Sequence, residues 1–179
     1  AHANDGGGSI RIPAAACGLV GLKPTRMRNP WGPDLGDVGF GLAVEHVVTR
    51  SVRDSATVLD ATAGTEIGAP YASPAKARPY TEEVGADPGS LRIGLMPDNH
   101  RVPTHADCEA ATRRTADLLA DMGHEVVESR PEAFGQIGEL KELAWAFILN
   151  WSVGAVVSLE TLGARLGRTV TADDVEPGT

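Results

Sequence analysis

The chain has 179 residues, of which 42% are hydrophobic and 22% charged, and it carries a formal net charge of −8. These values are typical of one folded domain and exclude a disordered or fibrous protein. Nucleic acids and acidic membrane surfaces require clustered Lys and Arg, whereas basic residues are scattered here, so we expect neither as a partner. We also find no apolar run near the length of about 20 residues that crosses a bilayer, and therefore expect a soluble protein.

Cysteine and histidine usage favours a cytoplasmic protein without a metal site. Cys17 and Cys108 are too few for a disulfide framework or a zinc cluster, so each is expected to be a small buried hydrophobe, as suits a reducing cytoplasm. His100 and His105 lie near two aspartates, which is a weak metal-ligand pattern. Two prolines in the same segment favour a polar loop instead.

The first distinctive feature in chain order is a run of three glycines, Gly6, Gly7 and Gly8, directly before Ser9. Because glycine lacks a side chain, the backbone there can take positive φ, and a ligand can approach the main-chain N–H groups. Ser9 then presents a hydroxyl. The apolar residues that follow predict a segment buried against a core: Ile10, Ile12, Ala14, Ala15, Ala16, Cys17, Leu19, Val20 and Leu22.

Three plainer interpretations compete with a functional serine loop. Gly-Gly-Gly-Ser is also typical of a flexible linker, although a linker is not followed by such an apolar run. Gly18, Gly21 and Lys23 suggest a phosphate-binding loop, but that motif needs Lys directly after the last Gly and Ser or Thr directly after the Lys. Leu22 and Pro24 occupy those two positions. A plain turn with an incidental serine stays open.

The same stretch resembles a known family. Residues 5–14 read Asp-Gly-Gly-Gly-Ser-Ile-Arg-Ile-Pro-Ala, and residues 17–25 read Cys-Gly-Leu-Val-Gly-Leu-Lys-Pro-Thr. Together they resemble the second half of the signature of the amidase signature family. Asn4 departs from the pattern, since many members carry Thr there. Shorter matches at 1–5, 50–54, 88–92 and 171–176 resemble the branch that contains the 6-aminohexanoate cyclic dimer hydrolase.

The resemblance implies an amide hydrolase with a Ser–cis-Ser–Lys triad that works through an acyl-enzyme, with Ser9 as the nucleophile. The backbone N–H groups of Gly6, Gly7, Gly8 and Ser9 would form the oxyanion hole. That role fits donors on a glycine loop, because the attacked carbonyl oxygen gains negative charge. The resemblance implies no metal and no organic cofactor, and the substrate-binding residues stay unknown.

Two charged residues flank the loop, and the rest of the triad is missing. Asp5 and Arg11 are expected to shape the loop through charge-assisted hydrogen bonds and not to touch the substrate. In the family, the catalytic Lys and the Gly-Ser-rich run with the cis-serine lie upstream, and neither occurs here, while Lys23 matches a structural lysine. We therefore expect an internal piece of a longer enzyme that cannot activate Ser9 alone.

The next segment alternates loops with two short elements. Residues 26–40, rich in Gly, Pro, Asp and Asn, predict an irregular surface loop in which Trp31 either walls a pocket or pins the loop. Residues 43–49 predict a strand. Ser51 then reads as the N-cap of a core-facing helix that Gly64 ends, and residues 65–90 as a long connection with four prolines.

The last two segments predict an α/β unit and a helical region. A strand over 91–96, a helix over 107–122 and a strand over 124–128 imply parallel pairing through a right-handed crossover. Apolar residues then recur at helical spacing from Leu140 to Leu159. We favour core packing for this helix over the wall of a substrate pocket, and Thr171 with Asp174 predicts one more helix start.

The predicted fold class is α/β: a mixed, largely parallel sheet flanked by helices, of the amidase signature type, present as the central part of a single domain. Within residues 1–179, the nucleophile loop with the C-terminal half of the signature spans 1–25. A loop, strand, helix and long connection span 26–90. The strand–helix–strand unit spans 91–130, and the helical region spans 131–179.

Two other functions stay open beside the amide hydrolase. One is a non-catalytic binding or assembly module on an amidase scaffold, which the absence of the upstream Lys and Gly-Ser-rich run would favour. The other is a Ser-His-Asp hydrolase, but Ser9 lacks the Gly-x-Ser-x-Gly elbow. The expected partner is a small-molecule amide: a cyclic amide, a linear oligoamide, a fatty amide or an aminoacyl-tRNA-linked glutamine. A homo-oligomer stays open, because oligomeric state leaves no readable trace.

Overall fold

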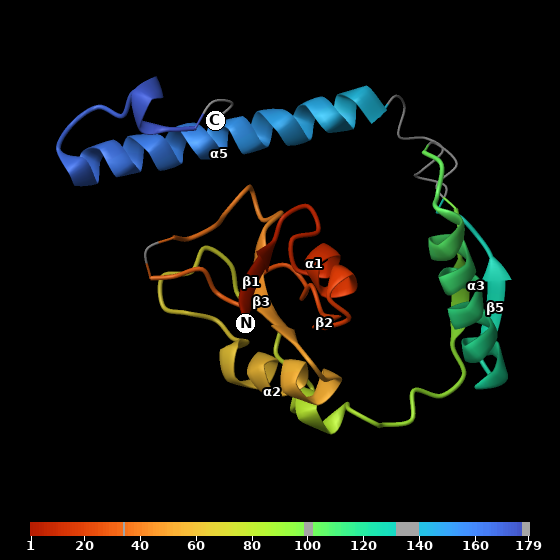
Figure 1. Cartoon of the computed structure of the whole chain (residues 1–179). Coiled ribbons are helices and arrows are strands. Elements are labelled where there is room, and N and C mark those ends of the chain that lie inside the picture. Colours follow the sequence, from red (N-terminus) through yellow and green to blue (C-terminus); the bar gives the residue numbers. More distant parts are fainter. Residues whose placement is uncertain (34, 99–101, 132–139, 177–179) are drawn as a thin grey trace. The chain divides into compact units, whose positions relative to one another are not determined.

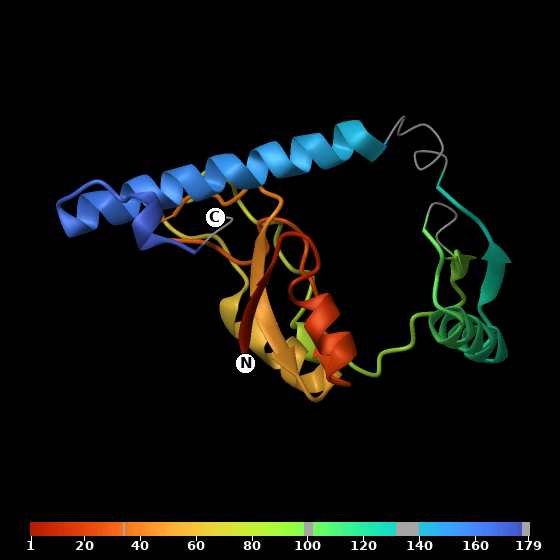
Figure 2. The ribbon, with the colours of Figure 1, turned by 45° about the horizontal axis from the view of Figure 1, so that its top comes forward.

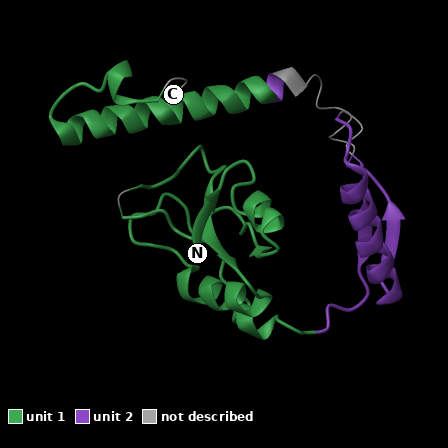
Figure 3. Cartoon of the chain, in the orientation of Figure 1, with its two compact units in different colours: residues 1–86, 144–179 green, residues 87–143 purple. Residues whose placement is uncertain are grey.

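The computed structural model describes residues 1–33, 35–98, 102–131 and 140–176, with side chains from 142 onward in the last range. Contacts divide the chain into two compact units (Figure 3). The first combines Ala1–Ala86 with Ala144–Thr179, and the second is Asp87–Leu143. The two units are described separately below.

A three-stranded antiparallel sheet lies at the centre of the first unit (Figure 1). Its strands are β1 (His2–Asp5), β3 (Val44–Thr49) and β2 (Val20–Gly21), in the order β1-β3-β2. Asp5 pairs with Val44 at the end of β1, so the glycine run leaves the sheet there. The strand predicted at 43–49 is confirmed as β3, whereas β1 was not foreseen.

The short helix α1 (Arg11–Ala16) follows the glycine run and packs on β2. Ile10 and Ala14 are buried, and a Cβ placed on Gly21 would lie 2.6 Å from the Ala14 Cβ, so the helix and strand touch closely. The prediction that this whole apolar stretch is buried is wrong. Ile12 is 66% exposed, because it lies two residues from the buried Ile10 and Ala14 and therefore on the opposite face of the helix. Leu19 and Leu22 are exposed too.

Helix α2 (Val52–Thr62) covers the same sheet and starts as predicted at Ser51, whose side chain accepts a hydrogen bond from the Asp54 N–H. It buries Ser55, Ala56 and Leu59. The Ser55 hydroxyl is 3.0 Å from Nε2 of the buried His46 on β3, and burial lowers the pKa of that imidazole. Core and polar contacts thus fasten α2 to β3.

The segments around these elements are mostly irregular, as expected. Residues 22–43 contain no helix or strand in the part that the structure describes. The later connection holds one short 3₁₀ helix, η1 (Tyr80–Glu82), and is tied to α2 at Asp60. That carboxylate accepts hydrogen bonds from the Tyr80 and Thr81 N–H groups and pairs with Lys76.

The second unit is a strand–helix–strand motif, as predicted. β4 (Arg92–Leu95) and β5 (Glu125–Glu128) pair in parallel, and α3 (Ala106–Asp121) connects them. Gly123 has φ +93° just after α3, a conformation that glycine accepts readily, so the helix ends where the sequence indicated. His105, one of the two histidines of the weak metal pattern, caps the start of α3 through the Asp107 N–H. The other, His100, lies outside the described residues.

These elements confirm a mixed α/β chain but correct two details. Among the described residues only β4 and β5 pair in parallel, so the predicted largely parallel sheet is not seen in this part of the domain. Both cysteines are exposed, contrary to the expectation that they are buried. Cys17 lies at the C-cap of α1 and Cys108 on α3, whose one buried residue in the described structure is Ala116.

The chain closes with the long helix α5 (Leu140–Leu166), continuous in Figure 2, and the 3₁₀ helix η2 (Ala172–Asp174). Thr171 and Asp174 form the capping box that the sequence indicated. Within α5, Glu142–Leu166 is long and apolar enough to cross a membrane by length and composition, with a mean hydropathy of 1.4. The prediction that no apolar run approaches that length is therefore wrong, and a core helix of a soluble protein would pass the same test.

Candidate active site

Asp5 organises the turn that carries Ser9. Its carboxylate is completely buried and accepts hydrogen bonds from the Gly8 N–H at 2.7 Å and the Ile10 N–H at 3.3 Å. Arg11 donates from Nε and Nη2 to both carboxylate oxygens, at 2.9 and 3.0 Å. The Asp5 side chain therefore binds the N–H groups of the residues directly before and after Ser9 and fixes the turn.

The same contacts set the charge state of the Asp5 carboxyl. The hydrogen bond from Arg11 is the largest cause that lowers its pKa well below the ordinary range, and the two backbone N–H donors act in the same direction. Burial opposes them but is outweighed. Asp5 is consequently a carboxylate at neutral pH and serves as a fixed acceptor, not as a proton donor.

Ser9 is exposed at the outer edge of this turn, while its neighbours Gly8 and Ile10 are buried. Gly8 has φ +124°, which a residue with a Cβ rarely adopts, and its carbonyl accepts from the Ile12 N–H at 2.8 Å to start α1. Among the described residues, the N–H groups of Gly6, Gly7 and Ser9 donate no hydrogen bond. These amides are available to a ligand, whereas the Gly8 N–H is engaged by Asp5.

A pocket of about 440 Å³ opens beside Ser9 in the first unit. The turn that carries Ser9, the 26–43 segment and α5 each contribute to its lining. Its wall includes Gly6, Ser9, Trp31, Leu42, Phe147 and Trp151. None of the described residues that line this pocket carries a charge. It is therefore a largely apolar, uncharged cavity, and its polar groups include the hydroxyl-bearing side chains of Ser9 and Ser158.

Helix α5 supplies the aromatic part of this wall. The rings of Phe147 and Trp151 stack with their centroids 5.4 Å apart. Asn150, between them in sequence, donates from Nδ2 to the Gly39 carbonyl at 3.2 Å. Phe147 and Trp151 are themselves 41% and 59% exposed, and Trp145 is 69% exposed, so the favoured interpretation of core packing is not met among the described residues of α5. The alternative, the wall of a pocket, describes Phe147 and Trp151.

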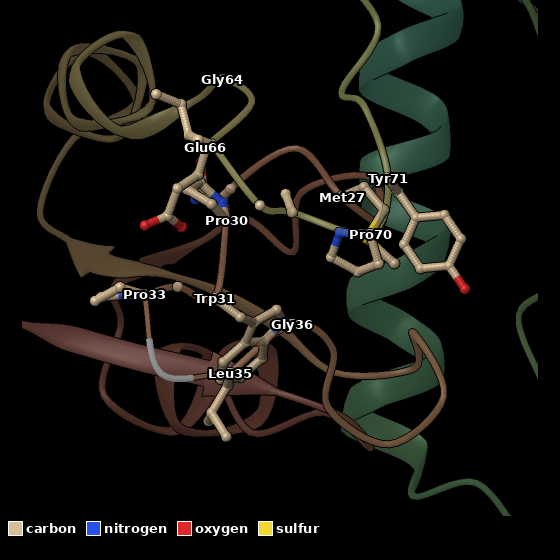
Figure 4. A pocket seen from close by; sticks show the side chains of 15 residues that line it. Met27, Pro30, Trp31, Pro33, Leu35, Gly36, Gly64, Glu66, Pro70 and Tyr71 are labelled. Carbon is tan, nitrogen blue, oxygen red and sulfur yellow. The ribbon is translucent and has the colours of Figure 1, made fainter.

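A second cavity, of about 110 Å³, lies between the segment from Met27 to Gly36 and the segment from Gly64 to Tyr71 (Figure 4). Trp31 lines both cavities, which agrees with its interpretation as a wall residue. Met27, Pro70 and Tyr71 line the second one, and Glu66 is the one charged residue among its described lining residues. Figure 4 shows the Tyr71 hydroxyl pointing away from Trp31.

Two other candidates from the sequence take no part in the pocket. Lys23 donates from Nζ to the Pro24 carbonyl at 2.8 Å, which is consistent with a structural lysine. The described residues contain no group of three or more His, Cys, Asp or Glu side chains that could hold a metal ion. Asn150 and Leu42 carried no recognisable signal in the sequence, because their place at the pocket depends on contacts between distant segments.

A match to a family model shows to which family the chain belongs. Residues 1–158 match the family described as Amidase, so this chain is a member of that family, the amidase signature enzymes. The family predicted from the Gly-Gly-Gly-Ser stretch is thereby confirmed.

Individual relatives agree with this membership. The chain is 41% identical over 180 residues to 6-aminohexanoate-cyclic-dimer hydrolases from Pseudomonas sp. and Paenarthrobacter ureafaciens, covering 98% of this chain and 36% of each relative. It is 31% identical to a putative amidase from Synechocystis sp., over 94% of this chain and 33% of that protein. The chain thus spans about a third of the length of these relatives.

Solved structures show the same similarity in three dimensions. A 6-aminohexanoate cyclic dimer hydrolase complexed with substrate superposes with a TM-score of 0.85 at 37% identity, over 98% of this chain and 36% of that one. A bacterial aryl acylamidase of the amidase signature family, at 24% identity and a TM-score of 0.80, shares the fold. The predicted resemblance to the branch with the 6-aminohexanoate cyclic dimer hydrolase is therefore confirmed.

Proposed function

We propose that the protein containing these residues hydrolyses a carboxamide through an acyl-enzyme on Ser9. The observation that carries this proposal is the exposed Ser9 hydroxyl at the wall of a neutral pocket, next to backbone N–H groups that have no partner among the described residues. A serine, an apolar pocket and free amide donors are what acyl transfer requires. Membership of the amidase family supports the same reaction.

In the proposed reaction, the Ser9 Oγ attacks the amide carbonyl carbon and gives its proton to the cis-serine, which passes a proton toward the lysine. Both of these residues would come from outside this segment. The C–N bond then breaks, and the leaving amine takes up a proton. Water attacks the resulting ester, which releases the carboxylic acid and restores the Ser9 hydroxyl. The 36% coverage of the relatives is consistent with partners located elsewhere in a longer chain.

The N–H groups of Gly6, Gly7 and Ser9 are the proposed oxyanion donors. Gly8, which the resemblance also implied, donates to Asp5 instead and would hold the turn in shape. Removing one oxyanion donor typically costs about 2.7 to 4 kcal/mol of transition-state stabilisation, so the conformation of this turn matters for the rate. Asp5 and Arg11 are proposed to maintain that conformation without contacting the substrate.

The proposed setting is the cytoplasm, with a small-molecule amide as substrate and no metal or organic cofactor, because the serine chemistry needs neither. The relatives named for a cyclic dimer of 6-aminohexanoate make a cyclic amide the first substrate class to test.

The test is labelling of the complete protein with a small fluorophosphonate, which reacts with activated serines. The wild type should be labelled, and Ser9→Ala should lose the label entirely. Ser152→Ala is the matched control, since Ser152 is an exposed serine on α5 and is absent from the described pocket lining, and it should keep full labelling. Labelling of Ser9→Ala at the wild-type rate would show that another residue is the nucleophile. An unlabelled wild type would favour a binding module.

A further inference from the structure

Two aromatic rings lie directly against the glycines that precede Ser9. A Cβ placed on Gly6 would lie 3.2 Å from Cζ3 of Trp151, and one on Gly7 would lie 3.4 Å from Cζ of Phe147. Both rings therefore lie near the backbone of the turn, with little more room than one added methyl group would fill. Because Gly6 and Gly7 carry proposed oxyanion donors, an acyl group bonded to Ser9 would have to pass beside this stacked pair.

The position of the rings is fixed by the helix that carries them. The Asn150 side chain binds the Gly39 carbonyl, one residue before Phe40, in a segment where Gly39, Phe40 and Gly41 all have positive φ. The hydrogen bond is made from the helical turn that lies between Phe147 and Trp151, so it holds both rings toward the pocket. Trp145, on the same helix, is not among the residues that line it.

The chemistry of the pocket indicates what it admits. No described lining residue is charged, so a charged group placed there would lose its hydration without gaining an ionic partner. A neutral apolar chain would gain contact with the Trp151 and Phe147 rings and with Leu42. The pocket thus favours an acyl group that enters it uncharged over one that ends in a carboxylate.

We propose that Trp151 is the residue that selects the acyl group of the substrate, admitting uncharged apolar acyl chains to the pocket beside Ser9. The proposal rests on the amide hydrolysis proposed above. It assigns to Trp151 direct contact with the acyl chain, and to Phe147 the role of supporting its ring by stacking.

The experiment measures kcat/KM of the complete protein with three anilides: acetyl, hexanoyl, and a carboxylate-terminated acyl chain of the same length as hexanoyl. The wild type should prefer hexanoyl over the carboxylate-terminated chain by at least roughly tenfold. In Trp151→Ala, the ratio of hexanoyl to acetyl kcat/KM should fall roughly 10-fold to 100-fold, because the lost contact is made with the longer chain only. Trp151→Phe should keep most of the ratio.

Trp145→Ala is the matched control, as it removes the same side chain from the same helix outside the described lining, and it should leave the ratio unchanged. Thermal unfolding is recorded for each variant. If Trp151→Ala does not fold, the Trp151→Phe ratio and the wild-type discrimination against the charged chain decide the question. An unchanged ratio in Trp151→Ala, an equal loss in Trp145→Ala, or equal wild-type rates on the neutral and charged chains would overturn the proposal.

Fluorophosphonate labelling separates this proposal from the one on which it rests. Trp151→Ala should still be labelled at Ser9, because a small probe does not need the acyl pocket. If Ser9 is labelled and the acyl preference is unaffected by the Trp151 substitutions, the selection by Trp151 is wrong and the hydrolase assignment stands. If Ser9 is not the labelled residue, the proposed function itself is wrong.

Discussion

Asp5 illustrates how one buried carboxylate can determine the shape of the turn that carries Ser9. It lies at the end of β1 and accepts from two N–H groups on either side of Ser9, as well as from Arg11. Charge-assisted hydrogen bonds of this kind are stronger than neutral ones, and they leave the remaining amides of the turn free. The exposed position of Ser9 thus depends on a buried residue that is absent from the described lining of the pocket.

Replacing Asp5 by Asn should lower the free energy of unfolding of the complete protein by about 2 to 3 kcal/mol at neutral pH. An amide cannot accept from Gly8, Ile10 and Arg11 together, and a buried donor without a partner costs about 1 to 3 kcal/mol. Urea unfolding measures the change. Asn4→Ala, next to it but exposed, is the control and should change stability little.

The same pair of proteins should differ in acid. Because the pKa of Asp5 is lower in the folded protein than in the unfolded one, its stabilising effect is complete above about pH 4 and is lost as the pH falls further. The difference in unfolding free energy between wild type and Asp5→Asn should therefore shrink below pH 4. A difference that stays constant down to pH 2 would contradict the assigned ionisation.

At the scale of elements, the contact between α1 and β2 holds the helix that follows Ser9. Gly21 on β2 faces Ala14 and the Ile10 carbonyl so closely that a Cβ would lie 2.6 Å from the first and 2.9 Å from the second. Neither neighbour is a flexible side-chain end that could swing away. The glycine is needed here for close approach and not for its backbone angle.

Gly21→Ala should destabilise the complete protein by about 1 to 3 kcal/mol, the usual cost of overpacking, and should slow labelling of Ser9 by displacing α1. The control is Gly64→Ala, because an added Cβ there meets no atom within 4 Å and the φ value is not positive. Thermal unfolding and the labelling rate check both effects. If Gly21→Ala behaves like Gly64→Ala, α1 does not pack on β2 as described.

The elements that sequence reasoning located are those with local signals. Ser51 marked the start of α2, Gly123 the end of α3, and alternating apolar residues marked β4. Helix α1 was not predicted because it has six residues, contains Pro13, and has no side-chain hydrogen bond from its N-cap residue, Ile10. Its exposed face was mistaken for core, since an apolar run that short has no readable period.

At the scale of the whole molecule, the pocket joins segments that are more than 100 residues apart. Asn150 reaches Gly39, 111 residues earlier, and Trp151 reaches Gly6. Periodicity along α5 shows that the helix is apolar, but it cannot show which of its residues contact the turn that carries Ser9. The family signature made Ser9 and its glycines candidates from the sequence, whereas the place of Phe147 and Trp151 at the pocket needed the three-dimensional structure.

The apolar surface of α5 also belongs to this scale. Side chains such as Trp145 and Leu149 are exposed in a chain that covers 36% of its relatives. A helix that is apolar all round is typical of a protein interior or of a membrane span. For this reason the apolar sequence of α5 favoured core packing, and the helix is also long and apolar enough to cross a membrane by length and composition.

The central claim is that Ser9 becomes covalently acylated during amide hydrolysis. The most direct measurement is mass spectrometry of the complete protein, quenched in acid during turnover of a hexanoyl anilide and digested. We predict a peptide containing Ser9 that is heavier by the acyl group, and no such adduct in Ser9→Ala. An adduct on a different residue, or turnover without any adduct and undiminished in Ser9→Ala, would contradict the account.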